Sequence, residues 1–427
     1  MRNVPSTVDE RFYEMDGLRG WASLSVMLSH LLFGVFINLE PPLVTPFLRS
    51  VFLEPFLGGT LDVAVFFVVS GDALSTSYWV RQSRKSVVRL AVKRYFRLVI
   101  PIFASCLIVL CLIKFGLSFN REAAAILNVE NWLGAFLRKD YSIADLFTYS
   151  GFYVFFHHQP ETALNPFLGT MQLELVGSAL VFCYLLLDYR IRRFRSVVLI
   201  LILCGGLSYG SFLACFPFGM MCSYFRSRGG FDWLRRQRVA QPLSILTAFT
   251  ALVMATYCNR IWPGWLPPSI IGSCLLVLGV YASSPLSRFF AMRFSCWLGR
   301  ISFPLYLTHF PVIASFTSCL VVQAHAHNAL PPTTIWLIVF GSASLSLFSA
   351  VLFLPVEMLT VRISDIICHS IMQRGPGVAK TLLRHLSVVT NSAEGRCEGL
   401  TLTGSARRRL RFTQANVRST IQRTLAP

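Results

Sequence analysis

Two histidines lie in the middle of long apolar segments of this chain, where an ionisable side chain is costly to desolvate. His30 occurs within WASLSVMLSHLLFGVFIN, which directly follows the element DGLRG at 16–20, and His309 occurs within LGRISFPLYLTHFPV. An imidazole at such a depth can join two helices by a hydrogen bond, or it can accept and return a proton during catalysis. The residue types leave both interpretations open, and both require a polar partner.

Two carboxylates occupy comparable positions in other apolar segments. Asp62 lies near the start of GGTLDVAVFFVVSGDALS, and Glu174 lies within LGTMQLELVGSALVF. A carboxylate can fix the tautomer of an imidazole and make it a useful general base. We therefore predict that Asp62 or Glu174 orients His30 in an active site. For each acid alone, a hydrogen bond between helices is the alternative.

The composition indicates an all-α integral membrane protein. Apolar residues make up 54% of the chain and charged residues only 14%, and the mean hydropathy is +0.58. A soluble domain usually carries about a quarter charged residues. Segments near the ~20 residues needed to cross hydrocarbon recur about ten times. We place these segments at 21–38, 60–80, 98–116, 168–187, 196–207, 208–225, 240–257, 268–283, 303–322 and 333–354.

The basic residues predict how the chain is oriented in the membrane. An even number of spans places both termini in the cytoplasm, and the loops then facing the cytoplasm are rich in Lys and Arg, as the positive-inside rule requires. This topology and attraction to anionic lipid account for the net charge of +19 without nucleic acid as a partner. A bacterial inner membrane is the preferred location. The cytoplasmic loops are 81–97, 190–195, 226–238 and 284–300.

One polytopic domain at 14–360 is predicted to carry the function. A short tail at 1–13 precedes it, and a basic tail at 361–427, rich in Ser, Thr and Gly, is predicted to be poorly ordered. The apolar stretch 143–156 is short for a span and is interpreted as interfacial or re-entrant. Most of the 12 cysteines fall inside apolar segments and no C-x-x-C pair occurs, so we predict neither a metal site nor a disulfide framework.

Five short motifs follow one another along the apolar part of the chain. They are DGLRG…H at 16–30, D-x-x-x-FF-x-x-SG at 62–71, KR-x-x-R-L-x-x-P at 93–101, a fourth segment that contains glutamate, and LG-x-IS-x-P-x-YL-x-H at 298–309. In this order they resemble the acyltransferase 3 family of polytopic membrane O-acyltransferases, over roughly residues 14–360. The resemblance implies about ten membrane helices, an acyl-CoA donor (acetyl-CoA by preference) taken from the cytoplasm, no bound cofactor, and a hydroxyl acceptor on a glycan, glycolipid or lipid-linked saccharide.

The resemblance also implies roles for individual residues. His30 is the base that deprotonates the acceptor hydroxyl, and Glu174, Asp62 and His309 complete the catalytic group. Arg94 and Arg97, with Arg19 of the L-R-G element, hold the phosphates of the donor, which suits the bidentate geometry of Arg. Without the resemblance, the basic stretch 81–97 is interpreted as a solvated loop.

The motif SG at Ser70-Gly71 supplies small residues that permit close helix approach. Asp72 departs from the family pattern, which commonly has an aromatic residue after SG. Such a charge requires either a wet helix end or a basic neighbour.

We therefore expect a membrane O-acyltransferase. A transporter or exporter of a small organic acid or glycan precursor, and a noncatalytic partner of an envelope synthase, remain as alternatives. Direct transfer and a two-step route through an acylated side chain are both compatible with the sequence. The oligomeric state is not predicted.

Overall fold

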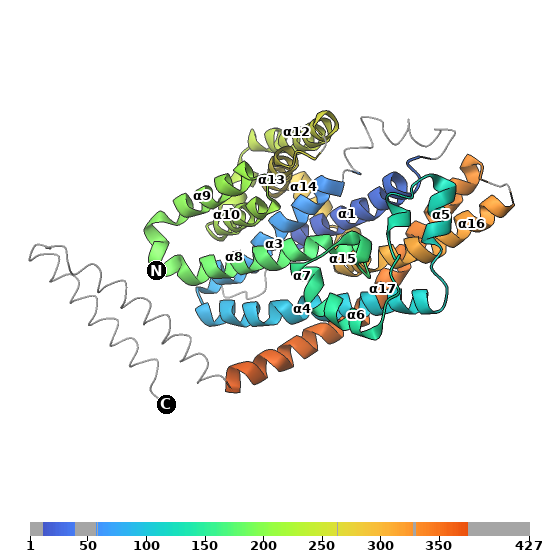
Figure 1. The fold of residues 1–427 in the computed structure, drawn as a ribbon. Helices are drawn as coiled ribbons and strands as arrows, with labels where there is room; N and C mark the ends of the chain where they lie inside the picture. Colours follow the sequence, from blue (N-terminus) through green and yellow to red (C-terminus); the bar gives the residue numbers. More distant parts are fainter. Residues whose placement is uncertain (1–11, 39–56, 58, 263, 328–329, 375–427) are drawn as a thin grey trace, which may run out of the picture. The chain divides into compact units, whose positions relative to one another are not determined.

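A computed structural model describes residues 12–38, 57, 59–262, 264–327 and 330–374 (Figure 1). Every regular element in these ranges is helical and none is a strand, which confirms the predicted all-α class. Most of the two predicted tails lies outside the described residues. The last helix, α17, continues past the predicted domain boundary at residue 360 and ends at Arg374. The site and contacts described below belong to the compact unit that ends at Asp365.

Seven helical segments among the described residues are long and apolar enough to cross a membrane, or eight if the bent pair α13–α14 counts as one span. The sequence predicts about ten spans, and the difference arises at 196–225, where it predicts two. The helices α9 and α10 in that region have only 14 and 13 residues, and α9 is joined to α8 within one of the seven segments. At the helical rise, 14 residues extend about 21 Å, less than the ~30 Å hydrocarbon core.

All four predicted cytoplasmic loops are largely helical instead, and two of them, 81–97 and 284–300, show why. The helix α4 (Arg84–Lys114) begins after Ser83, whose hydroxyl accepts the backbone N–H of Ser86, so most of 81–97 forms its first turns. The stretch 284–300 forms α14 and the start of α15. Lys and Arg are good helix formers, so a basic run shortens the apolar segment without ending the helix.

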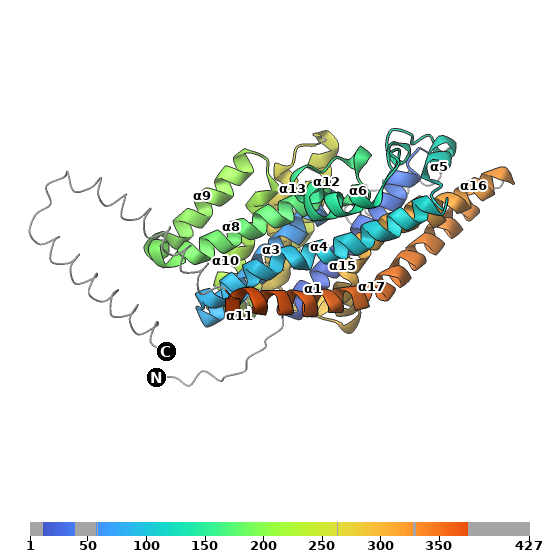
Figure 2. The ribbon, with the colours of Figure 1, turned by 60° about the horizontal axis from the view of Figure 1, so that its bottom comes forward.

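Five helices form a closed ring around the interior that holds the candidate site. Around the ring, each helix packs against the next: α1 against α3, α3 against α8, α8 against α4, α4 against α15, and α15 against α1. These helices run roughly side by side in both ribbon views (Figures 1 and 2). The ring consists of α1 (Tyr13–Ser29), α3 (Gly59–Arg81), α4, α8 (Thr170–Ile191) and α15 (Arg293–Val312).

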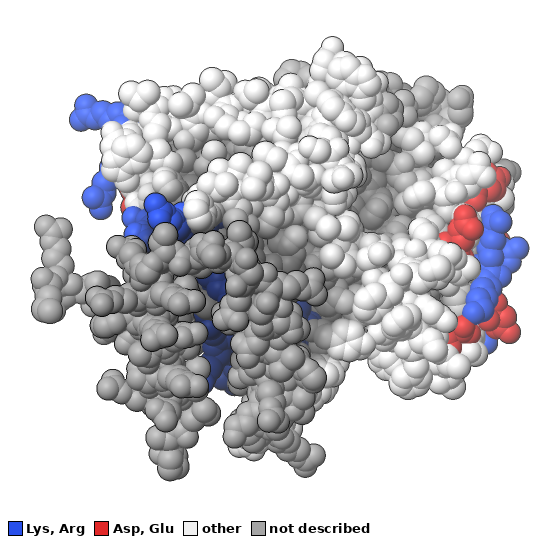
Figure 3. All heavy atoms as spheres, turned by 60° about the vertical axis from the view of Figure 1, so that its left-hand side comes forward, with Lys and Arg blue, Asp and Glu red and all other residues white. Residues whose placement is uncertain are grey.

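The remaining helices cover this ring and connect its members. One face of the described residues carries its charged side chains at two edges, with a broad uncharged band between them (Figure 3). Such a band is what a membrane-embedded surface requires. The covering elements are α5 (Asn120–Leu127), α6 (Ile143–Thr148), α7 (Val154–Phe156), α9 (Arg195–Ser208), α10 (Cys215–Ser227), α11 (Gly230–Arg236), α12 (Ala240–Ile261), α13 (Pro267–Ala282), α14 (Ser284–Phe290), α16 (Ser318–Ala326) and α17 (Pro332–Arg374).

The close contact between α1 and α15 depends on glycine. A Cβ atom on Gly20 would lie 2.5 Å from the backbone nitrogen of Gly299, and one on Gly299 would lie 2.2 Å from the carbonyl oxygen of Asp16. The hydroxyl of Ser23 donates to the Ser302 carbonyl at 2.8 Å across the same contact. The absence of side chains lets the two backbones touch, which brings the histidine-bearing ends of α1 and α15 to the same depth.

The predicted close approach at the SG motif is confirmed on α3. A Cβ on Gly71 would lie 2.3 Å from the carbonyl oxygen of Phe216 on α10. Asp72, next in the chain, forms a bidentate ion pair with Arg226 at 2.7 and 2.8 Å, so a basic neighbour compensates its charge. Arg226 is the first residue of the predicted cytoplasmic loop 226–238, but it belongs to α10 and its side chain is only 10% exposed.

Replacing Gly71 with alanine is expected to destabilise the fold, because the added methyl group meets backbone rather than a movable side chain. Overpacking of this kind typically costs about 1–3 kcal/mol. Thermal unfolding of the purified protein in detergent measures the effect. Gly205→Ala is the matched control, since a Cβ on Gly205 meets nothing within 4 Å. Equal melting temperatures for the two variants would contradict the close contact between α3 and α10 at Gly71.

Candidate active site

The two histidines that the sequence places in the middle of apolar segments meet directly. Nδ1 of His30 lies 3.0 Å from Nε2 of His309, and the two rings are nearly parallel with their centroids 5.3 Å apart. His30 is the first residue of the π-helix η1 (His30–Val35), and the π-helix η9 (Ile313–Thr317) directly follows α15. π-Helical turns are rare and occur frequently at functional sites.

The hydrogen bonds of His309 determine where the protons lie. Nδ1 of His309 is 2.9 Å from the carbonyl oxygen of Leu305, which can only accept, so Nδ1 carries the proton. Nε2 of neutral His309 is then an acceptor, and Nδ1–H of His30 must be its donor. This leaves Nε2 of His30 with a free lone pair and without a protein partner among the described residues. A nitrogen in this state can remove a proton from a hydroxyl group.

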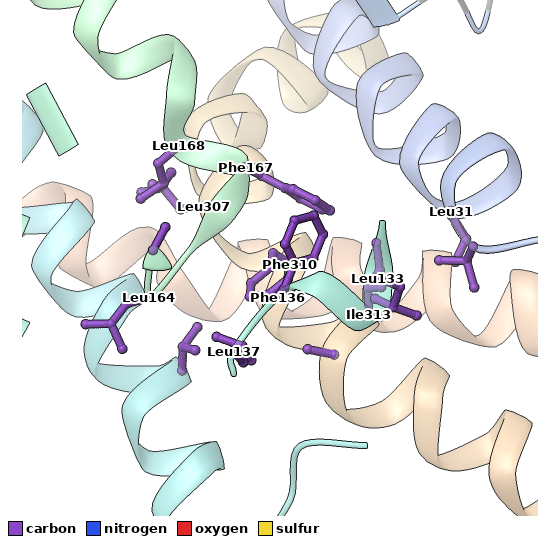
Figure 4. Close-up of a cluster of buried hydrophobic side chains, with 14 of the residues drawn as sticks. Leu31, Leu133, Phe136, Leu137, Leu164, Phe167, Leu168, Leu307, Phe310 and Ile313 are labelled. Atoms are coloured by element: carbon purple, nitrogen blue, oxygen red, sulfur yellow. The ribbon is translucent and has the colours of Figure 1, made fainter. Parts of the chain in front are cut away.

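A proline near His309 leaves a backbone carbonyl of α15 free, and side chains from other elements bind it. Pro311 has no N–H, so the Leu307 carbonyl four residues earlier lacks its helical donor. The Ser105 hydroxyl on α4 donates to this carbonyl at 2.7 Å, and the Asn165 side-chain amide donates to it at 3.2 Å. His309 itself is fully buried beside the apolar cluster of Figure 4, in which Leu307 and Phe310 of α15 meet side chains from the 133–168 region.

A cavity of about 1500 Å³ opens beside His30. Aromatic rings form part of its wall: Phe167 stacks on His30 with centroids 4.1 Å apart, and Trp132 lies 6.1 Å from His30. Trp132 packs against Gly34 of η1, where a Cβ would lie 2.3 Å from the indole ring. The hydroxyl-bearing Thr60 also lines this space, which we call the large cavity.

A second cavity, of about 270 Å³, lies inside the five-helix ring and contains the predicted arginines. Arg19, Arg94 and Arg97 line it, as do the carboxylates of Glu174 and Glu357. We call it the arginine cavity. The two cavities adjoin, because the same four residues line both: Val26, Val63, Thr170 and Tyr306. These four side chains form the boundary between the two cavities.

The three arginines differ in how much of their hydrogen-bonding capacity is free. Arg94 is paired with Glu174, its Nε donates to Ser178 at 2.9 Å, and its Nη2 reaches Ser70 at 3.3 Å. Arg19 and Arg97 form no hydrogen bond or ion pair with the described residues. Arg94 is therefore part of the cavity wall, whereas Arg19 and Arg97 offer open donors to an anion.

Neither of the two carboxylates predicted to orient His30 is hydrogen-bonded to it. Glu174 is held by Arg94 and by the Ser70 hydroxyl, and Asp62 accepts from the Ser25 hydroxyl at 2.5 Å. The prediction that one of these acids orients His30 is wrong, because both are used in other contacts and the buried partner is His309. Among the described residues, no three His, Cys, Asp or Glu side chains are placed to share a metal ion.

Several residues of the site were missed by the sequence reasoning. Trp132 and Phe167 lie in the 117–167 region, and nothing in their spacing marks them as cavity-lining. Tyr306 lies within the YL-x-H motif, and its hydroxyl donates to the Phe167 carbonyl and accepts from Thr170 at 2.7 Å. His158 also lines the large cavity, and burial lowers its pKa, which a bond to the Pro166 carbonyl offsets only in part.

Fold and site together define a polytopic membrane protein with a pair of hydrogen-bonded histidines and an adjoining cavity lined by arginines. The acyltransferase 3 family model, described as an acyltransferase domain, matches residues 12–354. The chain therefore belongs to this family and is a membrane acyltransferase. The searches of curated proteins and of solved structures found no match.

Proposed function

We propose that this protein transfers an acyl group, acetyl by preference, from acyl-CoA to a hydroxyl group of a glycan or lipid-linked saccharide. The observation that carries the proposal is the free Nε2 of His30, which lines a cavity that adjoins the arginine cavity. A base, a phosphate-binding site and a passage between them are the three parts that this reaction needs.

The donor is assigned to the arginine cavity. Arg19 and Arg97 have open guanidinium donors, which bind phosphate through charge-assisted and often bidentate hydrogen bonds. The pantetheine arm then extends past Val63 and Tyr306, so that the thioester enters the large cavity near His30. The proposal places this entry on the cytoplasmic side of a bacterial inner membrane, with both termini in the cytoplasm.

The reaction follows as direct transfer. Nε2 of His30 takes the proton of the acceptor hydroxyl while the hydroxyl oxygen attacks the thioester carbonyl carbon. The carbon–sulfur bond then breaks, and the CoA thiolate takes the proton back from His30. The hydroxyls of Ser29 and Thr60, which line the large cavity, are candidates to donate to the transient oxyanion. Loss of one such donor typically costs about 3 kcal/mol in the barrier.

The acceptor is assigned to the large cavity. Its volume of about 1500 Å³ exceeds what an acetyl group requires and is above the ~300–1000 Å³ of ordinary small-molecule sites. Flat aromatic surfaces such as Trp132, next to polar groups such as Asn131 and Glu161, suit a saccharide with both apolar ring faces and hydroxyls.

The donor assignment is tested by transfer of label from acetyl-CoA to an added envelope saccharide in membranes that contain the protein. The double variant Arg19→Gln/Arg97→Gln is expected to raise KM for acetyl-CoA by about 10²–10⁴-fold, because each of the two lost charge-assisted bonds contributes roughly 1.5–3 kcal/mol. Arg121→Gln is the control, since Arg121 is an exposed arginine on α5 outside both cavities. An unchanged KM in the double variant would refute the donor site.

A further inference from the structure

One carboxylate of the arginine cavity has no role in the reaction described above. Glu357 lies on α17, beyond residue 354 where the family match ends. Its half-buried side chain lines the arginine cavity together with Arg19 and Arg97. Both arginines lie close enough for their charges to act on it. Within the described residues, however, Glu357 forms no ion pair within 4 Å.

The other acidic residues near this cavity are already engaged. Glu174 is paired with Arg94, and Asp365, two turns after Glu357 on α17, is paired with Lys93. Glu357 is therefore the one cavity carboxylate, among the described residues, that faces arginines with unused donors. In the empty cavity it partly neutralises both of them.

A negative charge at this place has a definite consequence for an anionic ligand. Phosphate groups that bind Arg19 and Arg97 come close to Glu357, and like charges at short range repel each other. The ligand must overcome this repulsion and replace the interaction that Glu357 has with the arginines. The carboxylate therefore weakens binding of the donor and also of the CoA product.

We propose that Glu357 is the counter-ion of Arg19 and Arg97 in the empty site and competes with the phosphates of CoA for them. It lowers the affinity of the donor site and is contributed by a helix segment outside the family match. The proposal rests on the assignment of the donor to the arginine cavity. An alternative role, in which the carboxylate accepts a hydrogen bond from the ligand, predicts the opposite sign for its removal.

The test is equilibrium binding of CoA to the purified full-length protein. Glu357→Gln is expected to lower the Kd for CoA by about tenfold, the size of a like-charge interaction of ~1.4 kcal/mol at this range. Glu357→Ala, which is also neutral, should tighten binding as well, so the result does not depend on one variant folding. Asp140→Asn is the control: it makes the same charge change at an exposed ion pair with Lys114, outside both cavities.

The outcomes separate the two proposals. Tighter binding in both Glu357 variants, with Asp140→Asn unchanged, supports the counter-ion role. Unchanged or weaker CoA binding in the Glu357 variants overturns it, and so does equal tightening in Asp140→Asn. If Arg19→Gln/Arg97→Gln still weakens CoA binding, the donor site stands and only the role of Glu357 is lost. If that double variant binds CoA normally, the donor assignment itself has failed.

Discussion

Replacing His30 with glutamine is expected to lower kcat for acyl transfer by about 10²–10⁴-fold, the range that a positioned general base contributes. Glutamine is polar and similar in reach, but its side chain has no basic nitrogen for the acceptor proton. The Kd for CoA should stay at its wild-type value, because His30 lines the large cavity and not the arginine cavity. Labelled product formation and CoA binding, measured on the same preparation, give both quantities.

The matched control is His325→Gln, which changes an exposed histidine on α16 away from both cavities. The control variant should transfer label at the wild-type rate. Wild-type activity in His30→Gln would exclude the proposed base. Incubating the wild-type protein with labelled acetyl-CoA and no acceptor separates the two chemical routes: label retained on the protein and absent from His30→Gln would identify an acylated histidine in place of direct transfer.

Replacing His309 with phenylalanine is expected to lower kcat by about 10–100-fold, the size of effect seen when a partner that orients a functional histidine is removed. Phenylalanine keeps a flat ring in the fully buried position but removes the acceptor for Nδ1–H of His30. The His30 proton can then move to Nε2, which abolishes the free lone pair. His309 does not reach the reacting atoms in this scheme, so it is a positioning residue.

A rescue experiment distinguishes this role from a loss of packing. His309→Gln supplies a side-chain carbonyl oxygen that can accept from His30, so it should retain more kcat than His309→Phe. KM for acetyl-CoA should be unchanged in both variants, because the arginine cavity is intact. If the two variants were equally impaired in kcat while melting at equally reduced temperatures, the effect of His309 would be structural only.

The hydrogen bond between His30 and His309 keeps a carboxylate charge away from His30. A carboxylate beside His30, as the sequence reasoning predicted, would place a full negative charge near the thioester. The structure instead keeps its carboxylates in other contacts, with Glu174 at Arg94 and Asp62 at Ser25. The rings that contact His30, those of Phe167 and Trp132, are uncharged and aromatic.

The amino-acid sequence by itself determined the class of protein and the depth of its ionisable groups. Apolar segments of sufficient length can only be helices in a membrane, since every backbone polar group must be satisfied within the segment. The position of His30 along its segment and of Arg94 and Arg97 at the start of theirs follows from residue spacing. Each of these is a position along one helix axis, which the local sequence is sufficient to determine.

Only the tertiary structure decided which of these groups meet. Membrane helices such as α3 and α8 are apolar around most of their circumference, so no amphipathic pattern shows which face turns inward. His30 and His309 are 279 residues apart, and their contact depends on close approach of α1 and α15 at glycines. The engagement of Glu174 by Arg94, and the place of Glu357 opposite Arg19 and Arg97, depend likewise on the rotation of each helix about its own axis. That rotation is set by packing between helices, which no single segment encodes.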